Sequence, residues 1–369
     1  MYVRAQMDSR FRGNDGEGLA LTRQPHAAAL HAQRRHALPL YKLLLRVALL
    51  LLAGCGIAAA QSPTIANIEY ARVNGQPLRL DLYLPAAPAI GRPLAVFVHG
   101  GGWSSGNKDV IQPAMLPLLD AGYALASVDY RLVNTQHANL YGGADAVVFP
   151  AAVHDVKAAV RFLRANARVY GFDAGRIALW GTSAGAHLAT LVALSDGDAA
   201  LEGSVGNHTA TSSAVQLAID GYGPTDILRM GPDAALAGFN PAGWDAPDTA
   251  HANLIGCGAQ GMGAIRANID NPAPPWPQCV ARANLANPVR QIDARDPPVW
   301  IGHSNDDQAV PWPQSQRLFD ALQGAGIDSA FVRAPTGGHQ LGPASWSLAR
   351  AFLLQRFAAE VPMLRDGFE

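Results

Sequence analysis

The chain has 369 residues, of which 49% are hydrophobic and 15% are charged, a composition typical of a globular protein rather than a disordered one. Its formal net charge of −1 provides no basic excess for a phosphate backbone, which argues against a nucleic acid partner. The length permits one large α/β domain as well as two or three smaller ones.

Residues 1–60 are predicted to be a leader that precedes the folded domain. Residues 1–39 show no apolar periodicity, so they are given no fold and leave the true start of the protein open. From Tyr41 onward, basic residues lead into an apolar run and then into small residues, which is the order of a secretory signal. The sequence therefore predicts export to the periplasm or the medium.

Two cleavage sites remain open within this signal. Leu52–Cys55 resembles a bacterial lipobox, in which Cys55 would carry a lipid anchor, whereas Ala58–Ala60 fits an ordinary signal cleavage before Gln61. The two remaining cysteines, Cys257 and Cys279, form an even pair in an exported domain, which predicts a disulfide. A pair of free buried thiols is the alternative, and the spacing matches no metal signature.

The folded domain, residues 61–369, begins with a predicted β-hairpin around Asn74-Gly75, because apolar and polar residues alternate on both sides of this turn. Six short apolar runs follow, and runs without alternation are typical of strands buried on both faces of a parallel sheet. They are residues 94–99, 124–130, 176–181, 215–222, 299–303 and 330–334.

Helical patterns lie between these runs, in residues 149–167, 184–195, 313–326 and 345–360. The alternation of strands and helices predicts a doubly wound α/β sheet that is mostly parallel. Residues 228–296 interrupt the alternation, contain Cys257 and Cys279, and are too long for an ordinary connection. We therefore expect a lid-like insertion before the penultimate strand.

Two serines match the pattern Gly-x-Ser-x-Gly of a hydrolase nucleophile, Ser104 and Ser183. Ser183 follows a predicted strand and precedes a predicted helix, as a nucleophile elbow requires. Ser104 follows three consecutive glycines and precedes a turn signal and a proline. The sequence thus favours Ser183 as the nucleophile.

The stretch His99-Gly100-Gly101-Gly102 resembles the oxyanion-hole loop found after the third strand of esterases and lipases. Glycines let backbone N–H groups approach a substrate oxygen, so Gly101 and Gly102 are expected donors. Ala184, the residue after the favoured nucleophile, is the third expected donor. Trp103 is expected to line the acyl or alcohol pocket, with a packing role as the alternative.

The base and the acid should follow the nucleophile in the order Ser, Asp, His. His339 has the required position in a loop just after the last predicted strand. The acid should follow the penultimate strand, where Asp306 and Asp307 are both available. The carboxylate that does not orient the histidine is expected to cap the loop.

These motifs together resemble the secreted α/β-hydrolase esterases related to hormone-sensitive lipase, and most closely their bifunctional acetylesterase/feruloyl esterase-like branch. The resemblance covers about residues 66–358 and is carried by HGGGW with Lys108, DYR at 129–131, the segments 149–167 and 171–189, GPTD at 223–226, and DDQAVP. In that family the acid lies four residues before the proline of Asp-x-x-Val-Pro, which selects Asp307. Ser304 departs from the family, where glycine is usual.

The resemblance implies an α/β-hydrolase fold and a serine carboxylesterase acting on small acyl or aromatic esters, free or linked to polysaccharide, with no metal or organic cofactor. Ser183, Asp307 and His339 would form the catalytic triad. An arylformamidase-type amide hydrolase and a non-catalytic binding module on this fold are the alternatives. Four further polar residues are interpreted as ion-pair and turn residues outside the site: Asp129, Arg131, Asp155 and Asp226.

Mass spectrometry of the mature N-terminus tests the export prediction. A diacylglyceryl group on Cys55 is expected if the lipobox is used, and a chain beginning at Gln61 is expected if the ordinary site is cleaved. A cytoplasmic chain that still begins at Met1 would contradict export.

Overall fold

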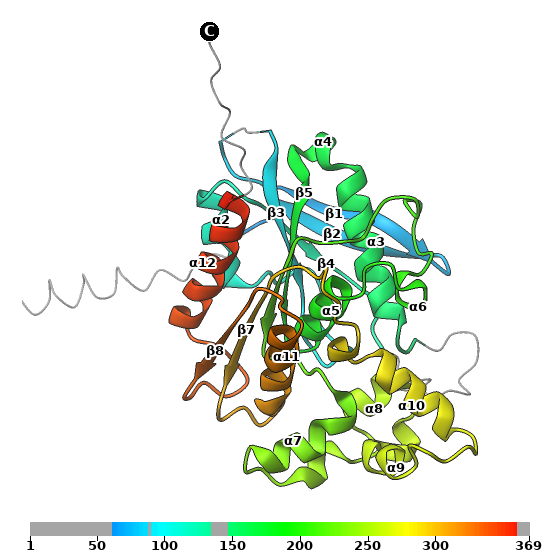
Figure 1. Cartoon of the computed structure of the whole chain (residues 1–369). Coiled ribbons are helices and arrows are strands. Elements are labelled where there is room, and N and C mark those ends of the chain that lie inside the picture. The colour runs from blue at the N-terminus through cyan, green and yellow to red at the C-terminus, as the bar shows by residue number, and fades with distance from the viewer. Residues whose placement is uncertain (1–60, 88–89, 134–146, 360–369) are drawn as a thin grey trace, which may run out of the picture. The chain divides into compact units, whose positions relative to one another are not determined.

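An eight-stranded sheet in the order β1-β2-β4-β3-β5-β6-β7-β8 forms the centre of the described part of the protein (Figure 1). The structure is a computed structural model that describes residues 61–87, 90–133 and 147–359, all within one unit, Gln61–Glu369. The predicted leader, secretory signal and lipobox lie outside these residues. Among the described helices, none combines the length and apolar character needed to cross a membrane.

The strands are β1 (Ile65–Val73), β2 (Gln76–Tyr83), β3 (Arg92–Val98), β4 (Ala124–Val128), β5 (Phe172–Thr182), β6 (Leu217–Gly221), β7 (Val299–Ser304) and β8 (Ser329–Ala334). The principal helices are α2 (Pro117–Asp120), α3 (Ala151–Ala165), α4 (Ala167–Tyr170), α5 (Ala184–Ala193), α6 (Ala199–Glu202), α11 (Pro313–Gly324) and α12 (Pro343–Ala359). The strand and helix order confirms the predicted α/β-hydrolase fold.

The predicted hairpin is present. Strands β1 and β2 pair antiparallel, with Val73 opposite Gln76, and the two residues between them have positive φ angles of 49° at Asn74 and 78° at Gly75. Such angles match the right-handed twist of a two-residue hairpin. Strand β2 pairs antiparallel with β4, and the pairs from β4 through β8 are parallel, as the buried apolar runs predicted.

Two strand boundaries differ from the sequence prediction. Strand β4 ends at Val128, not residue 130, because the next side chains hold the loop after β3: Asp129 Oδ1 accepts from Lys108 N at 2.8 Å, and Tyr130 Oη donates to the His99 carbonyl at 2.8 Å. Strand β5 begins at Phe172, four residues before the predicted start, with a register shift beside Arg92. A local turn, in which Gly175 N donates to Asp173 Oδ1, hides this extension in the sequence.

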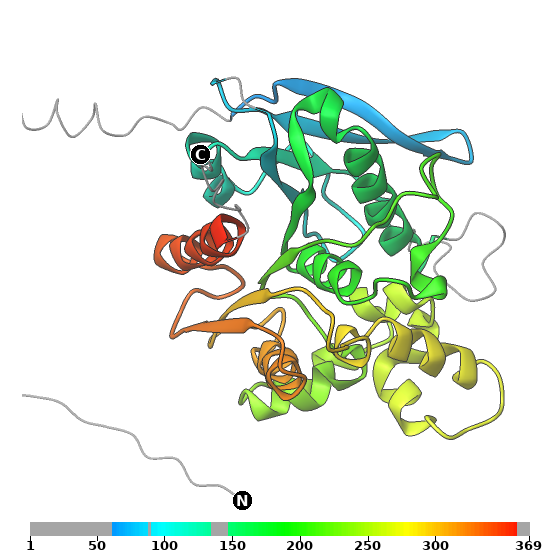
Figure 2. The same cartoon turned by 45° about the horizontal axis from the view of Figure 1, so that its top comes forward.

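Helices cover both faces of the sheet (Figure 2). Successive side chains of β3 point to opposite faces and so enter two different hydrophobic cores. Leu94, Val96 and Val98 pack in one core with α3, α5 and α11, whereas Ala95 and Phe97 pack in the other core with α2 and α12. In the second core, Trp346 of α12 lies against Trp180 and Trp300, with ring centroids 5.5 and 6.0 Å away. Burial on both faces explains why these strands read as continuous apolar runs.

The predicted insertion is helical. It contains α7 (Met230–Leu236), α8 (Ala250–Ile255), α9 (Gly261–Ala267) and α10 (Trp276–Leu285), together with short 3₁₀ turns. Its proline, glycine and asparagine residues interrupt the helices, which is why the sequence showed no long helical period. A disulfide joins Cys257, after α8, to Cys279 in α10, as the cysteine count predicted. This insertion lies beside the carboxyl ends of the central strands (Figure 1).

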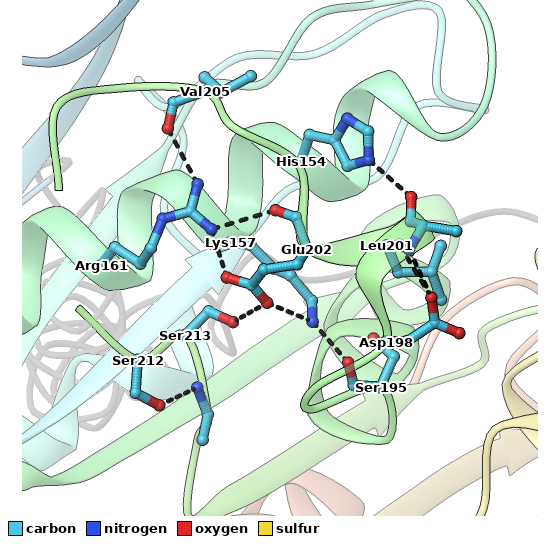
Figure 3. A network of polar contacts seen from close by, with 12 residues as sticks. His154, Lys157, Arg161, Ser195, Asp198, Leu201, Glu202, Val205, Ser212 and Ser213 are labelled. Atoms are coloured by element: carbon cyan, nitrogen blue, oxygen red, sulfur yellow. Dashed lines mark hydrogen bonds and ion pairs between the residues drawn. The ribbon is translucent and has the colours of Figure 1, made fainter. Parts of the chain in front are cut away.

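A polar network fastens α3 to α6 and to the loops around it (Figure 3). Lys157 and Arg161 on α3 are buried, and both contact the carboxylate of Glu202. Lys157 Nζ donates to Glu202 Oε2 at 3.0 Å and to the Ser195 carbonyl at 2.7 Å, while Ser213 Oγ donates to Glu202 Oε2 at 2.7 Å. Burial opposes ionisation of Glu202, but these donors outweigh it and lower its pKa. One carboxylate therefore compensates two buried cations.

Glu202→Gln should lower the free energy of unfolding by about 3 kcal/mol, because removing one partner leaves buried charges without compensation. Glu69→Gln is the matched control, since Glu69 pairs with Arg72 on the surface, where their side chains are 39% and 52% exposed. That change should cost less than about 1 kcal/mol. Urea unfolding followed by circular dichroism measures both, and equal losses would contradict the assignment.

Candidate active site

Ser183 stands in a strained turn between β5 and α5. Its φ of 53° and ψ of −125° lie outside the usual regions for a residue with a side chain. A Cβ on Gly181 would lie 2.2 Å from the Gly185 carbonyl oxygen, and a Cβ on Gly185 would lie 2.1 Å from that of Val98. Both flanking residues must therefore be glycine, and the turn has the conformation that the sequence predicted for an elbow.

The glycine loop after β3 lies next to this turn. Gly101 and Gly102 have positive φ angles of 117° and 58°, and both line the same pocket as Ser183 and Ala184. Ala184 is the first residue of α5, where backbone N–H groups have no intrahelical acceptor. The three predicted oxyanion residues are thus brought together around one pocket.

Residues on neighbouring strands fix the far end of the loop. The buried Lys108 ammonium contacts Asp81 of β2 at 3.1 Å and Asp109 at 2.8 Å. The His99 ring stacks on Tyr130, with centroids 4.3 Å apart. These contacts explain why HGGGW, Lys108 and DYR occur together in the sequence.

Trp103 lines the pocket and is also packed in the core. Both roles that the sequence left open for it are therefore present. Its side chain is buried, and Nε1 donates to Nδ1 of His187 at 3.2 Å. His187 Nε2 donates in turn to the Ala286 carbonyl at 2.7 Å, and burial lowers the His187 pKa to about 4, which keeps the ring neutral. His187 therefore links the elbow helix, the glycine loop and the end of the insertion.

Ser183, His339 and Asp307 form one hydrogen-bonded chain. Ser183 Oγ lies 2.8 Å from His339 Nε2, and His339 Nδ1 lies 2.7 Å from Asp307 Oδ2. Because a carboxylate oxygen only accepts, Nδ1 carries the hydrogen, and Nε2 is free to accept the serine proton. Tyr222, with a positive φ of 50°, packs its ring against His339 with centroids 4.8 Å apart.

The Asp307 carboxylate is buried and hydrogen bonded through both of its oxygens. Oδ1 accepts from Ala309 N at 2.8 Å and Val310 N at 3.0 Å, and Oδ2 also lies 3.2 Å from Nε2 of the buried His303. Burial opposes ionisation, but the hydrogen bonds from His303 and His339 outweigh it and lower the Asp307 pKa to about 2. The group facing His339 is therefore an anion at neutral pH.

The neighbours of Asp307 hold the loop that carries His339. Asp306, the other candidate acid, is exposed, and its Oδ1 accepts from Gly338 N at 2.8 Å, which is the loop-capping role expected for it. Ser304 Oγ donates to the Gln340 carbonyl at 2.7 Å. Serine at this position thus adds a hydrogen bond that the usual glycine lacks.

Other sequence candidates lie away from this chain of hydrogen bonds. Ser104 is exposed in a turn, where its N–H donates to the Gly101 carbonyl at 3.1 Å. Arg131 and Asp155 form a bidentate ion pair, with Nε and Nη2 each 2.8 Å from a carboxylate oxygen. Asp226 precedes a 3₁₀ turn, where its carbonyl accepts from Gln314 Nε2 at 3.1 Å.

The hydrogen-bonded chain opens into a pocket of about 650 Å³. The glycine loop, the His339 loop and the insertion all contribute to its walls, which consist of Gly101, Gly102, Trp103, Gln112, Ser183, Ala184, Tyr222, Pro224, Met230, Ala250, His251, Ala309, Val310, His339, Gln340, Leu341 and Trp346. None of these described lining residues is Asp, Glu, Lys or Arg. The structure also shows no group of three or more metal-ligating side chains within residues 61–87, 90–133 and 147–359.

Sequence reasoning missed His187, Tyr222, His251 and His303. For His187 a signal existed, since it lies in the first turn of the helix that follows Ser183. The other three contact the site only through tertiary packing, which a single sequence does not reveal.

Comparison with known proteins finds a matching family model and relatives that are named as esterases. A family model described as BD-FAE matches residues 80–322. The esterase LipQ of Mycobacterium tuberculosis is 27% identical over 255 residues, covering 69% of this chain and 51% of LipQ. The probable carboxylic ester hydrolase LipM of the same organism is 26% identical over 272 residues, covering 72% of this chain and 52% of LipM. The chain spans about half the length of these curated relatives.

Solved structures of other proteins have the same fold as this protein. A truncated carbohydrate esterase from gut microbiota superposes with a TM-score of 0.64 at 27% identity, covering 82% of this chain and 98% of that protein. A bifunctional GH43-CE protein of Bacteroides eggerthii gives a TM-score of 0.63 at 30% identity, covering 80% of this chain and 35% of that protein.

Because the pKa of Asp307 is low in the folded protein, the free energy of unfolding should depend on pH through this group. A carboxyl group with a depressed folded pKa stabilises the fold above its unfolded pKa and loses that contribution as the pH falls. The difference in unfolding free energy between the wild type and Asp307→Asn should therefore shrink by about 2 kcal/mol from pH 6 to pH 2. Urea unfolding over this range measures it, with Asp306→Asn as the control. A constant difference for Asp307→Asn would show that its carboxylate is not stabilised by the fold.

Proposed function

Because the chain belongs to the BD-FAE family, we propose that it is an exported serine carboxylesterase. The observation that carries the proposal is the hydrogen-bonded chain from Ser183 through His339 to Asp307, which ends in a pocket beside the glycine loop. The relatives named esterase and carboxylic ester hydrolase support the same chemistry.

In the proposed reaction, Ser183 Oγ attacks the ester carbonyl carbon while His339 Nε2 takes its proton. The Asp307 anion holds His339 in the required tautomer and stabilises the ring when it becomes positively charged. His339 then gives this proton to the departing alcohol, which leaves an acyl group on Ser183. Water, activated by the same histidine, releases the acid and restores the serine.

Negative charge develops on the carbonyl oxygen during each attack. The N–H groups of Gly101, Gly102 and Ala184 would stabilise it, because donors that are already oriented need no rearrangement when the charge forms. The N-terminus of α5 adds the positive end of its helix dipole at the same place.

The proposed substrates are uncharged esters of small acyl or aromatic acids, free or attached to carbohydrate. The described pocket walls offer aromatic and aliphatic side chains, Ser183, two imidazole rings and two glutamine amides, and they contain no Asp, Glu, Lys or Arg. An ionised substrate group would lose its hydration there without gaining a partner. The structural neighbour named as a carbohydrate esterase supports the sugar-linked part of this proposal.

The proposal is tested by comparing hydrolysis of 4-nitrophenyl acetate, methyl ferulate and N-formylkynurenine by the purified protein. We expect turnover of one or both esters and little turnover of the formamide. Preferential cleavage of N-formylkynurenine would favour an arylformamidase-type amide hydrolase, and absence of turnover with all three would favour a binding module.

Two serine variants, assayed for ester hydrolysis and for labelling by a fluorophosphonate, identify the nucleophile. Ser183→Ala should abolish ester hydrolysis and labelling by a fluorophosphonate, because only binding and the oxyanion donors remain. Ser104→Ala should still be labelled, since Ser104 lies in an exposed turn. Peptide mapping of the labelled wild-type protein locates the label, and label on Ser104 would overturn the assignment.

A further inference from the structure

His251 lines the pocket and has one ring nitrogen without a hydrogen-bond partner in the described part of the chain. It lies in α8 of the insertion, is only 5% exposed, and is one of the residues that line the pocket. Its neighbour Ala250 packs against the glycine loop, since a Cβ on Gly102 would lie 3.3 Å from the Cβ of Ala250. The insertion therefore places His251 beside the oxyanion residues. It contributes none of the three hydrogen-bonded residues Ser183, His339 and Asp307.

The ring of His251 has a fixed tautomer. Nε2 lies 2.8 Å from the Trp244 carbonyl oxygen, which only accepts, so Nε2 carries the hydrogen. Burial lowers the His251 pKa to about 4, and the ring is neutral at neutral pH. Trp244 is itself held, because its Nε1 donates to the Ala309 carbonyl at 3.2 Å. Nδ1 of His251 consequently carries a lone pair and no hydrogen.

This lone pair has no protein partner in the described part of the chain. Nδ1 makes no hydrogen bond there, yet it is not one of the fully enclosed unpaired atoms, in contrast to Nε2 of His99. A small accessible area therefore remains at Nδ1, on a residue that is otherwise buried and lines the pocket. An acceptor on a residue that is only 5% exposed has little access to water, so a ligand that supplies a donor stabilises it.

We propose that His251 Nδ1 accepts a hydrogen bond from a hydroxyl group of the substrate, and that the pocket therefore selects hydroxyl-bearing esters. The proposal rests on the esterase function proposed above and narrows its substrate class. The hydroxyl group belongs either to the acyl part, as in a phenolic acid, or to the alcohol part, as in a sugar. In both cases the O–H donates to Nδ1 while Ser183 faces the ester carbonyl.

Matched pairs of esters, in which one hydroxyl is free or methylated, separate these two sources. Methyl 4-hydroxycinnamate and methyl 4-methoxycinnamate place the group on the acyl side, and 2-hydroxyethyl acetate and 2-methoxyethyl acetate place it on the alcohol side. The quantity measured is the ratio of kcat/KM for the hydroxylated ester to that for its methylated partner. This ratio cancels effects common to both esters.

Two variants of His251 separate its two nitrogens. In His251→Gln the amide nitrogen can still donate to the Trp244 carbonyl, but the acceptor at the Nδ1 position is lost. In His251→Asn the amide oxygen can replace Nδ1 as acceptor, whereas the donor to Trp244 is lost. Thermal unfolding of both variants verifies that each is folded.

In at least one pair, the wild-type ratio should exceed that of His251→Gln by about tenfold, the size of one hydrogen bond, and His251→Asn should keep most of the preference. Equal ratios in the wild type and His251→Gln for both pairs would overturn the proposal.

Calorimetric binding of the same esters to Ser183→Ala distinguishes this inference from the proposed function. If the wild type hydrolyses no ester but Ser183→Ala binds the hydroxylated ester more tightly, the hydroxyl site stands and the esterase function fails. If esters are hydrolysed with no dependence on the hydroxyl group in turnover or binding, the function stands and this inference fails.

Discussion

The close backbone contact between β5, α5 and the end of β3 is the constraint on which the rest of the site depends. Gly185 packs its backbone on the Val98 carbonyl, and Gly181 packs on Gly185, at distances that leave no room for a Cβ. The chain can reverse from strand to helix in this space only by placing Ser183 at a positive φ. The same contact brings the glycine loop, which begins just after Val98, to the N-terminus of α5. Ser183 and the proposed oxyanion residues are thus positioned by one packing arrangement.

The rest of the hydrogen-bonded triad is organised around the Asp307 carboxylate, in the loop after the carboxyl end of β7. Three N–H groups donate to this buried carboxylate, two from its own loop and one from His339, and Nε2 of His303 lies 3.2 Å from Oδ2. Because Oδ1 accepts from two backbone N–H groups and Oδ2 accepts from His339, the side chain cannot rotate without losing several hydrogen bonds. A fixed acid in turn fixes the ring of His339. Ser304 and Asp306 hold the backbone of the same loop, so the histidine is oriented through its ring and through its main chain.

Much of this arrangement could be predicted from the sequence, because local chemistry determines it. Asn74-Gly75 specified the hairpin, and the double-sided apolar runs specified the parallel strands. The predicted strand before Ser183 and the predicted helix after it distinguished this serine from Ser104. What could not be predicted depends on contacts between distant segments. The early start of β5 is concealed by a local turn at Asp173, and the helices of the insertion are too short to show a period. The roles of His251 and His303 appear only when α8 and β7 are packed beside the site. The choice between Asp306 and Asp307 also needed the family resemblance, since their neighbours in sequence do not distinguish them.

The pocket is built from two parts of the chain that are constrained differently. The sheet supplies Ser183, His339 and Asp307, and each of these is tied to backbone geometry that tolerates little change. The insertion supplies Met230, Ala250 and His251 from short helices fastened to one another by the Cys257–Cys279 disulfide and to the site by Trp244 and His187. Substitutions at Met230, Ala250 or His251 therefore alter the walls of the pocket and leave in place the backbone contacts that position Ser183 and Asp307. In evolutionary terms, the proposed substrate preference can change through point substitutions in one segment, while the residues of the hydrogen-bonded triad are inherited unchanged.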